Sequence, residues 1–194
     1  MAISKSQLPR LIDDAAYALK KTEKSFKRTE KTDAVIGDFK GLPDAFPVVA
    51  KRVPVLPKLL DSIEAYISAE KETQEAKERY AGVGKLAKSC QREAAYLHDL
   101  FSAVTDPDED VPKLERYRQA VADGNGKRIE TVLKDLLEKA LQAVAPPLID
   151  GKLVKELQEA FEEVSKLKPS LKEEPKGAVT LISNGSGSQF YHGG

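Results

Sequence analysis

Apolar residues recur every three or four positions along most of the chain, which is the spacing of one face of an α-helix. The clearest stripe lies within residues 82–104, and similar stripes predict helices over residues 5–31, 128–144 and 150–167. We expect the members of the clearest stripe to be buried, and they are Val83, Leu86, Cys90, Ala94, Leu97, Phe101 and Val104.

Prolines divide the segment that follows the first predicted helix, because proline suits the first turn of a helix and disrupts its interior. The sequence therefore predicts a short helix near Asp44–Arg52, a kink, and a second helix from Pro54 to Ala69. A further short helix should begin at Pro112, ahead of a turn at residues 123–126. The charged residues 70–79 have no clear apolar stripe, and they either extend a helix or bridge two helices.

No part of residues 1–168 alternates with period two over a useful length, so we expect this range to form an all-α bundle of about six helices. Lys plus Arg and Asp plus Glu number 31 each. The zero net charge argues against a nucleic-acid partner and favours self-association. A single cysteine and the lack of an apolar leader or membrane-length run predict a cytoplasmic protein.

The first predicted helix is amphipathic. Leu8, Ile12 and Leu19 are among the residues on its apolar face, and cations gather on the opposite face. The simplest interpretation is a solvated face, and the sharper one is a helix that lies on an anionic membrane. The candidate membrane-facing residues are Lys20, Lys21, Lys24, Lys27, Arg28 and Lys31.

Residues 169–194 differ in kind from the rest of the chain. Pro169 and Pro175 indicate a linker, and from Gly177 onward no Asp, Glu, Lys, Arg or Pro occurs. We expect this tail to be disordered alone and able to stack in cross-β form, with a plain flexible linker as the alternative. An amyloid motif would depend on Val179, Leu181, Ile182, Asn184, Gly185, Gly187, Gln189, Phe190 and Tyr191.

The sequence offers little for catalysis, a cofactor or a metal. It contains no P-loop pattern, and Cys90 and His98 lie about two turns apart on one predicted helix, roughly 12 Å along its axis. The acidic run 106–110 lacks the loop length of an EF-hand. We therefore expect a protein that is not an enzyme and has no catalytic, cofactor-binding or metal-binding residues.

Several segments, in their order and spacing, resemble the SesA-type N-terminal domain of fungal NACHT and P-loop NTPase receptors of the NLR class. The most specific are Gly41-Leu42-Pro43-Asp44-Ala45-Phe46 and Leu114-Glu115-Arg116-Tyr117-Arg118-Gln119-Ala120-Val121, within a span of roughly residues 32–145. Asn184-Gly185-Ser186-Gly187-Ser188-Gln189-Phe190 is similar to the amyloid signalling motifs of such systems.

The resemblance implies a signalling or effector domain in fungal non-self recognition (heterokaryon incompatibility) and regulated cell death. The tail would mediate homotypic amyloid templating, so the expected partners are further copies of the chain and an NLR-type receptor or effector with the same motif. The alternative is a membrane-targeting cell-death effector that uses the basic helix and associates with the plasma membrane on activation.

Overall fold

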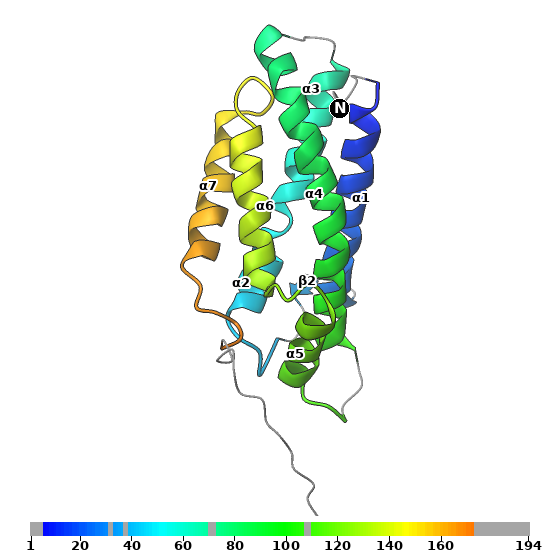
Figure 1. Ribbon diagram of the computed structural model, residues 1–194, viewed down its shortest axis with the longest axis vertical. Coiled ribbons are helices and arrows are strands. Elements are labelled where there is room, and N and C mark those ends of the chain that lie inside the picture. Colours follow the sequence, from blue (N-terminus) through cyan, green and yellow to red (C-terminus); the bar gives the residue numbers. More distant parts are fainter. Residues whose placement is uncertain (1–5, 31–32, 37–38, 70–72, 107–109, 173–194) are drawn as a thin grey trace, which may run out of the picture.

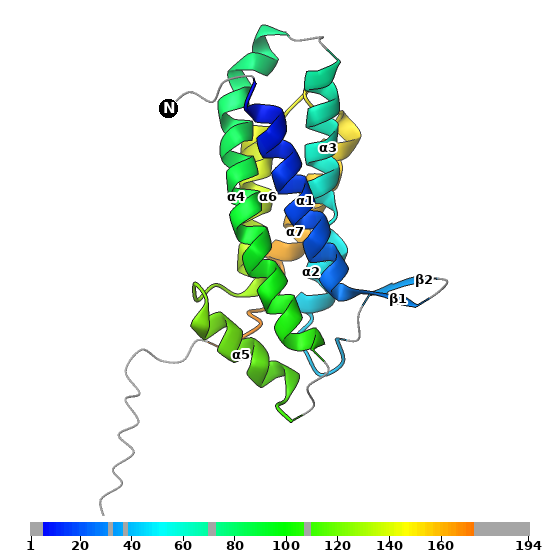
Figure 2. The same ribbon diagram turned by 90° about the vertical axis from the view of Figure 1, so that its right-hand side faces the viewer.

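The computed structural model describes residues 6–30, 33–36, 39–69, 73–106 and 110–172, with only the backbone described for residues 27–30 and 33–36. This part of the chain forms a helical bundle (Figure 1) with one small hairpin (Figure 2). Its elements are α1 (Leu8–Phe26), β1 (Lys27–Glu30), β2 (Asp33–Ile36), α2 (Ala45–Arg52), α3 (Val55–Ser68), α4 (Gln74–Thr105), α5 (Lys113–Asp123), α6 (Ile129–Ala143) and α7 (Gly151–Ser165). The expected all-α bundle is confirmed, with seven helices in the described ranges where about six were expected.

Helices α1, α3, α4, α6 and α7 run along the length of the bundle, and α4, with 32 residues, is the longest of them. It packs against α1 on one side and α6 on the other, while α3 packs on α1 and α7 packs on α6. The shorter helices α2 and α5 lie toward the end of the bundle at which α4 terminates (Figures 1 and 2). The apolar stripes of all these helices therefore face one shared core.

The core has the residues that the periodicity predicted. All seven members of the stripe on α4 are buried, each at most 1% exposed. At the α2–α5 end of the bundle, aromatic rings join four helices. Phe26 and Phe101 have ring centroids 4.4 Å apart, and Phe46 meets Tyr117 edge-to-face at 4.8 Å. Phe46 also meets Phe101 at 6.0 Å, which links the two pairs. Such pairs add about 0.5–1.5 kcal/mol beyond their area burial, so this cluster holds α1, α2, α4 and α5 together.

The first helix is shorter than predicted. It ends at Phe26 rather than at residue 31, and Lys27–Glu30 pairs in antiparallel register with Asp33–Ile36. Continuing the apolar stripe beyond Phe26 would require apolar residues three and four positions later, where Thr29 and Glu30 stand. With nothing to bury, the helix gives way to a two-stranded hairpin (Figure 2).

Most of the charged stretch 70–79, which the sequence left as either a helix extension or a bridge, belongs to α4. The helix begins at Gln74, and the side chain of Thr73 caps it by accepting a hydrogen bond from the amide of Ala76 at 3.2 Å. Of the two alternatives, extension of the following helix is therefore correct for residues 74–79. Residues 70–72 lie outside the described ranges.

Candidate functional site

The predicted basic face divides into two parts in the structure. Lys20, Lys21 and Lys24 are exposed on α1, and Lys20 forms an ion pair with Asp61 of α3 at 2.8 Å. Lys27 and Arg28 belong to β1 instead of the helix, a correction to the predicted face, and their side chains are not described. Lys31 lies outside the described residues.

The apolar face of α1 is not available to a membrane. Leu8, Ile12 and Leu19 are each at most 1% exposed, because α4 and α3 pack over this side of the helix. Exposing the face would require α1 to leave the core. Any contact of α1 in the folded domain with a lipid surface must therefore use its polar side.

Tyr17 is the most exposed large hydrophobic residue in the described part of the chain, at 73%. It borders two shallow depressions. One, of about 450 Å³, is lined by the side chains of Lys20, Lys21, Glu23 and Lys24. The other, of about 480 Å³, lies between α1 and α4. An exposed tyrosine beside lysines combines apolar area with positive charge, and tyrosine is enriched in protein contact surfaces.

Cys90 and His98 do not form a nucleophilic pair. Cys90 is fully buried, and burial raises the pKa of its thiol to about 12, so it stays protonated and unreactive. His98 Nδ1 lies 3.4 Å from Ser102 Oγ and 3.8 Å from an Asp99 carboxylate oxygen. In a serine–histidine–aspartate relay the two partners use different ring nitrogens, so one nitrogen near both provides no relay.

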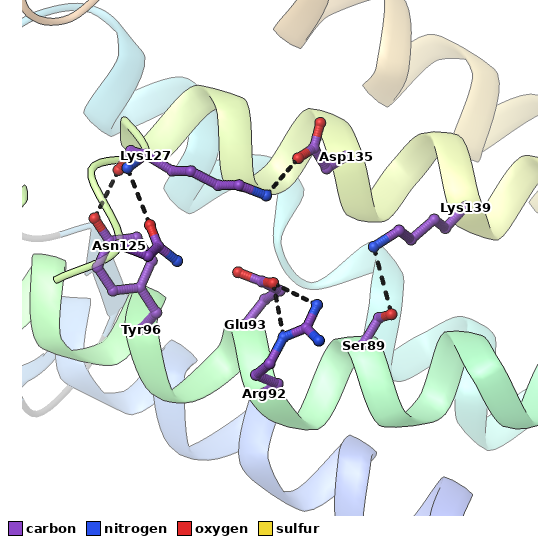
Figure 3. Close-up of polar contacts among 8 residues, drawn as sticks. All are labelled: Ser89, Arg92, Glu93, Tyr96, Asn125, Lys127, Asp135 and Lys139. Atoms are coloured by element: carbon purple, nitrogen blue, oxygen red, sulfur yellow. Dashed lines mark hydrogen bonds and ion pairs between the residues drawn. The ribbon is translucent and has the colours of Figure 1, made fainter.

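A row of polar side chains follows the seam between α4 and α6 (Figure 3). Lys127 forms an ion pair with Asp135 at 2.9 Å, and the hydrogen bond within this pair raises the pKa of Lys127. Lys139 donates a hydrogen bond to the Ser89 hydroxyl at 3.4 Å. Glu93 is 5% exposed, and its Oε1 accepts two hydrogen bonds from Arg92. Its Oε2 has no hydrogen-bond partner in the described part of the chain.

The same seam holds the turn before α6 in place. The hydroxyl of Tyr96 donates to the carbonyl oxygen of Lys127 at 2.7 Å, and the Asn125 side chain accepts from the Lys127 amide at 3.0 Å (Figure 3). A Cβ added at Gly124 would come within 2.3 Å of the Tyr96 ring. Glycine is therefore required where this turn closes over α4.

A buried polar network that no sequence pattern indicates lies where α5, α6 and the stretch after α7 meet. The stretch after α7, residues 167–172, crosses the α5–α6 corner, and we call it the C-terminal strap (Figure 1). Ser170 is 6% exposed and Glu130 is 7% exposed. The Ser170 amide donates to Glu130 Oε1 at 3.0 Å, and its hydroxyl donates to Glu130 Oε2 at 2.7 Å. Pro169 had suggested a linker here, and no local pattern marks Ser170 as a buried residue.

The strap is held at two further points. Arg128 donates to the carbonyl oxygen of Leu171 at 3.1 Å, and the hydroxyl groups of Tyr117 and Ser170 lie 2.7 Å apart. Burial raises the pKa of Tyr117 to about 12. The network is therefore a compact polar cluster that joins α5, α6 and the strap.

The predicted amyloid residues Val179, Leu181, Ile182, Asn184, Gly185, Gly187, Gln189, Phe190 and Tyr191 all lie outside the described residues, as does the middle of the acidic run 106–110. Within the described ranges, no helix is both long and apolar enough to cross a membrane. The same ranges contain no group of three or more His, Cys, Asp or Glu side chains placed to hold a metal ion.

One family model matches the chain. It covers residues 14–143 and describes SesA, an N-terminal domain on NACHT NTPases and P-loop NTPases. The match runs from the middle of α1 to the last residue of α6, and so takes in most of the bundle. Comparison with curated proteins and with solved structures returned no match. Because the family model covers more than half of the sequence, the chain belongs to the SesA family.

Proposed function

We propose that this chain is a non-enzymatic signalling module of an NLR-type system, in which a helical SesA domain is coupled to a self-templating segment at residues 177–194. The observation that carries the proposal is the SesA match over residues 14–143, because the family is described as an N-terminal domain on NACHT and P-loop NTPases. A domain in that position connects an NTPase receptor to a downstream response. NLR-type receptors, or effectors with the same motif, are then its partners.

The interior of the bundle supports a role in binding rather than catalysis. Cys90, the strongest nucleophile that the sequence contains, is enclosed in the core with its pKa raised to about 12. His98 has the geometry of a surface residue with a local serine contact rather than of a base in a relay. We therefore infer that the domain acts through its surfaces and through residues 177–194.

The composition of residues 177–194 supports homotypic templating. The segment has no charged residue and no proline, so identical copies stacked about 4.8 Å apart would meet no repulsion between like charges. Gln189 and Asn184 can form side-chain ladders in such a stack, and Phe190 and Tyr191 can stack on their own copies. We propose that this assembly triggers regulated cell death in the manner of fungal incompatibility systems.

A cellular recruitment experiment tests this function. The full chain is expressed in fungal cells together with a fluorescent protein that carries only residues 177–194. We expect the two proteins to converge in the same foci and viability to fall in cells that contain them. Phe190→Asp in either partner should abolish convergence, because each added carboxylate would face its copies along the stack. Diffuse fluorescence beside the wild-type chain would contradict the proposal.

A second candidate function is peripheral contact with an anionic membrane, and the exposure of Tyr17 favours it. Tyrosine is common at membrane interfaces, and here it stands beside Lys21 and Lys24 on the polar side of α1. Because the apolar side of α1 is buried, this mode would be electrostatic adsorption without insertion. It is compatible with the first function, since assembly would multiply the number of basic faces per particle.

A further inference from the structure

The contacts of the C-terminal strap are those by which proteins bind peptides. Glu130 accepts one hydrogen bond from the Ser170 amide and one from its hydroxyl, and Arg128 donates to the carbonyl of Leu171. Backbone groups of two successive residues and one specific side chain are thus engaged together, which gives both affinity and selectivity. Leu167 and Leu171 rest partly buried against the core on either side.

The receiving side of this contact is built from the bundle alone. Tyr117 is fully buried, its ring packs on Phe46, and its hydroxyl accepts a hydrogen bond from the Ile129 amide at 3.0 Å. Arg128 Nε lies 3.4 Å from Glu130 Oε1, so the cation and the carboxylate are placed by α6 and its N-terminal cap. The corner therefore holds its acceptor and donor groups in position through contacts that do not involve the strap.

Apart from the partial burial of Leu167 and Leu171, the strap has few other contacts to hold it. It follows the last turn of α7 without regular secondary structure, and its Lys168 and Pro169 are exposed. Among the described residues, the four buried polar or charged side chains are Thr22, Glu93, Glu130 and Ser170. Two of these four, Glu130 and Ser170, bond to each other in the contact between the corner and the strap. Hydrogen bonds rather than general core packing therefore determine which segment fits the corner.

We propose that the α5–α6 corner, formed by Tyr117, Arg128 and Glu130, is a peptide-binding site that the chain's own strap occupies in the monomer and that accepts the identical strap of a second copy when its own is displaced. A second copy carries the same Lys-Pro-Ser-Leu segment, so every hydrogen bond at the corner can form between chains. In a single chain the strap is tethered, at an effective concentration of about the millimolar range, and therefore excludes a dilute competitor. This inference stands independently of the proposed function.

Displacing the strap in the full chain tests the proposal. Ser170→Asp places a carboxylate against Glu130 and should release the strap through like-charge repulsion. The probe is a fluorescein-labelled peptide with the sequence of residues 165–172, and binding is measured by fluorescence anisotropy. We expect saturable binding to Ser170→Asp, and binding to the wild-type chain at least about tenfold weaker, because the tethered strap of the wild-type chain competes with the probe for the corner.

Two matched controls separate site recognition from general attraction. Ser165→Asp adds the same charge at an exposed position one turn earlier and should behave as wild type. A probe with Asp in place of Ser170 should bind the Ser170→Asp chain at least about tenfold more weakly than the natural probe does. If the Ser170→Asp chain melts as a folded protein and binds both probes alike, or neither, the corner is not a peptide-binding site.

Hydrogen exchange on the wild-type chain provides a test that requires no variant. The Ser170 amide should exchange through a local opening, faster than amides in the centre of α4, which open only on global unfolding. Excess unlabelled peptide should occupy the corner and keep the chain's own strap displaced. The exchange rate of the Ser170 amide alone should therefore rise. If the Ser170 amide exchanges only with global unfolding and the peptide has no effect, the proposal is overturned.

Discussion

The hydroxyl oxygen of Tyr117 lies 2.7 Å from that of Ser170, although the two residues are 53 positions apart. The same Tyr117 hydroxyl accepts the amide hydrogen of Ile129, the first residue of α6, at 3.0 Å. It therefore caps one helix and holds the C-terminal strap at the same time. The first four amides of a helix have no partner within the helix, which makes this acceptor valuable.

Tyr117→Phe should destabilise the domain by about 1–3 kcal/mol, because it leaves the buried Ile129 amide without an acceptor while keeping the ring in place. The measurement is the free energy of unfolding from denaturant titration followed by circular dichroism. Tyr17→Phe removes the same atom from a side chain that is 73% exposed and should be neutral. Equal effects of the two substitutions would mean that the Tyr117 hydroxyl has no structural role.

The fold could be predicted from the sequence wherever burial is periodic. The stripe from Val83 to Val104 identified α4 because each member meets the core, and the prolines correctly placed the break between α2 and α3. The hairpin was missed because a four-residue strand has too few alternating positions to give a pattern. The end of α1 at Phe26 coincides with the end of its apolar stripe, because Thr29 and Glu30 occupy the next positions of that face.

The polar contacts could not be predicted for a different reason. Ser170 is buried only because α7 directs the chain back across the α5–α6 corner, where its hydroxyl donates to Glu130. Its local sequence, with Pro169 before it and lysines around it, is typical of an exposed linker. Likewise Glu93 stands on a charged helix, and its burial follows from the packing of α6 on α4. Long-range packing decides both sites.

The thiol of Cys90 should react with iodoacetamide only when the domain unfolds. Burial raises its pKa from 9.0 to about 12, so the native thiol has almost no thiolate at pH 8. Labelling followed by mass spectrometry should give negligible modification of the native chain and full modification in denaturant. Rapid labelling of the native chain, without loss of helical signal, would place Cys90 outside the core.

The same shift fixes the direction of a pH effect on stability. In the unfolded chain the thiol ionises near its ordinary pKa of 9.0, whereas in the folded chain it stays protonated up to about 12. The contribution of the protonated Cys90 thiol to the free energy of unfolding is therefore complete below pH 9. This contribution is lost as the pH rises toward 12. Tyr117, whose pKa rises from 10.0 to about 12, adds to the loss in the upper part of this range.

Adsorption to anionic vesicles should depend on the polar side of α1. The paired substitution Lys21→Glu with Lys24→Glu should weaken binding to phosphatidylserine-containing vesicles, since each lysine near the surface contributes about 1 kcal/mol. Co-sedimentation with the vesicles measures the bound fraction at low and at high salt. High salt should also weaken the binding of the wild-type chain, because salt screens the attraction.

The matched control for the vesicle experiment is Lys152→Glu with Lys155→Glu on α7. These lysines are also exposed, and the paired change alters the net charge equally, but α7 lies on the other side of the bundle from α1 (Figure 1). We expect the control to retain most of the binding. If both pairs reduce adsorption alike, net charge rather than the α1 face determines it.

The central claim, a helical domain coupled to a self-templating segment, is tested most directly by seeded assembly of the full chain. Fibrils of the wild-type chain are added to fresh wild-type, Gln189→Lys and Phe190→Asp chains, and assembly is followed by light scattering and fibre diffraction. We predict that seeds shorten the lag of the wild-type chain alone, that its fibres show a repeat of about 4.8 Å, and that both variants keep wild-type thermal melts. A wild-type chain that stays monomeric at high concentration would contradict the account, as would fibres that Gln189→Lys and Phe190→Asp leave unimpaired.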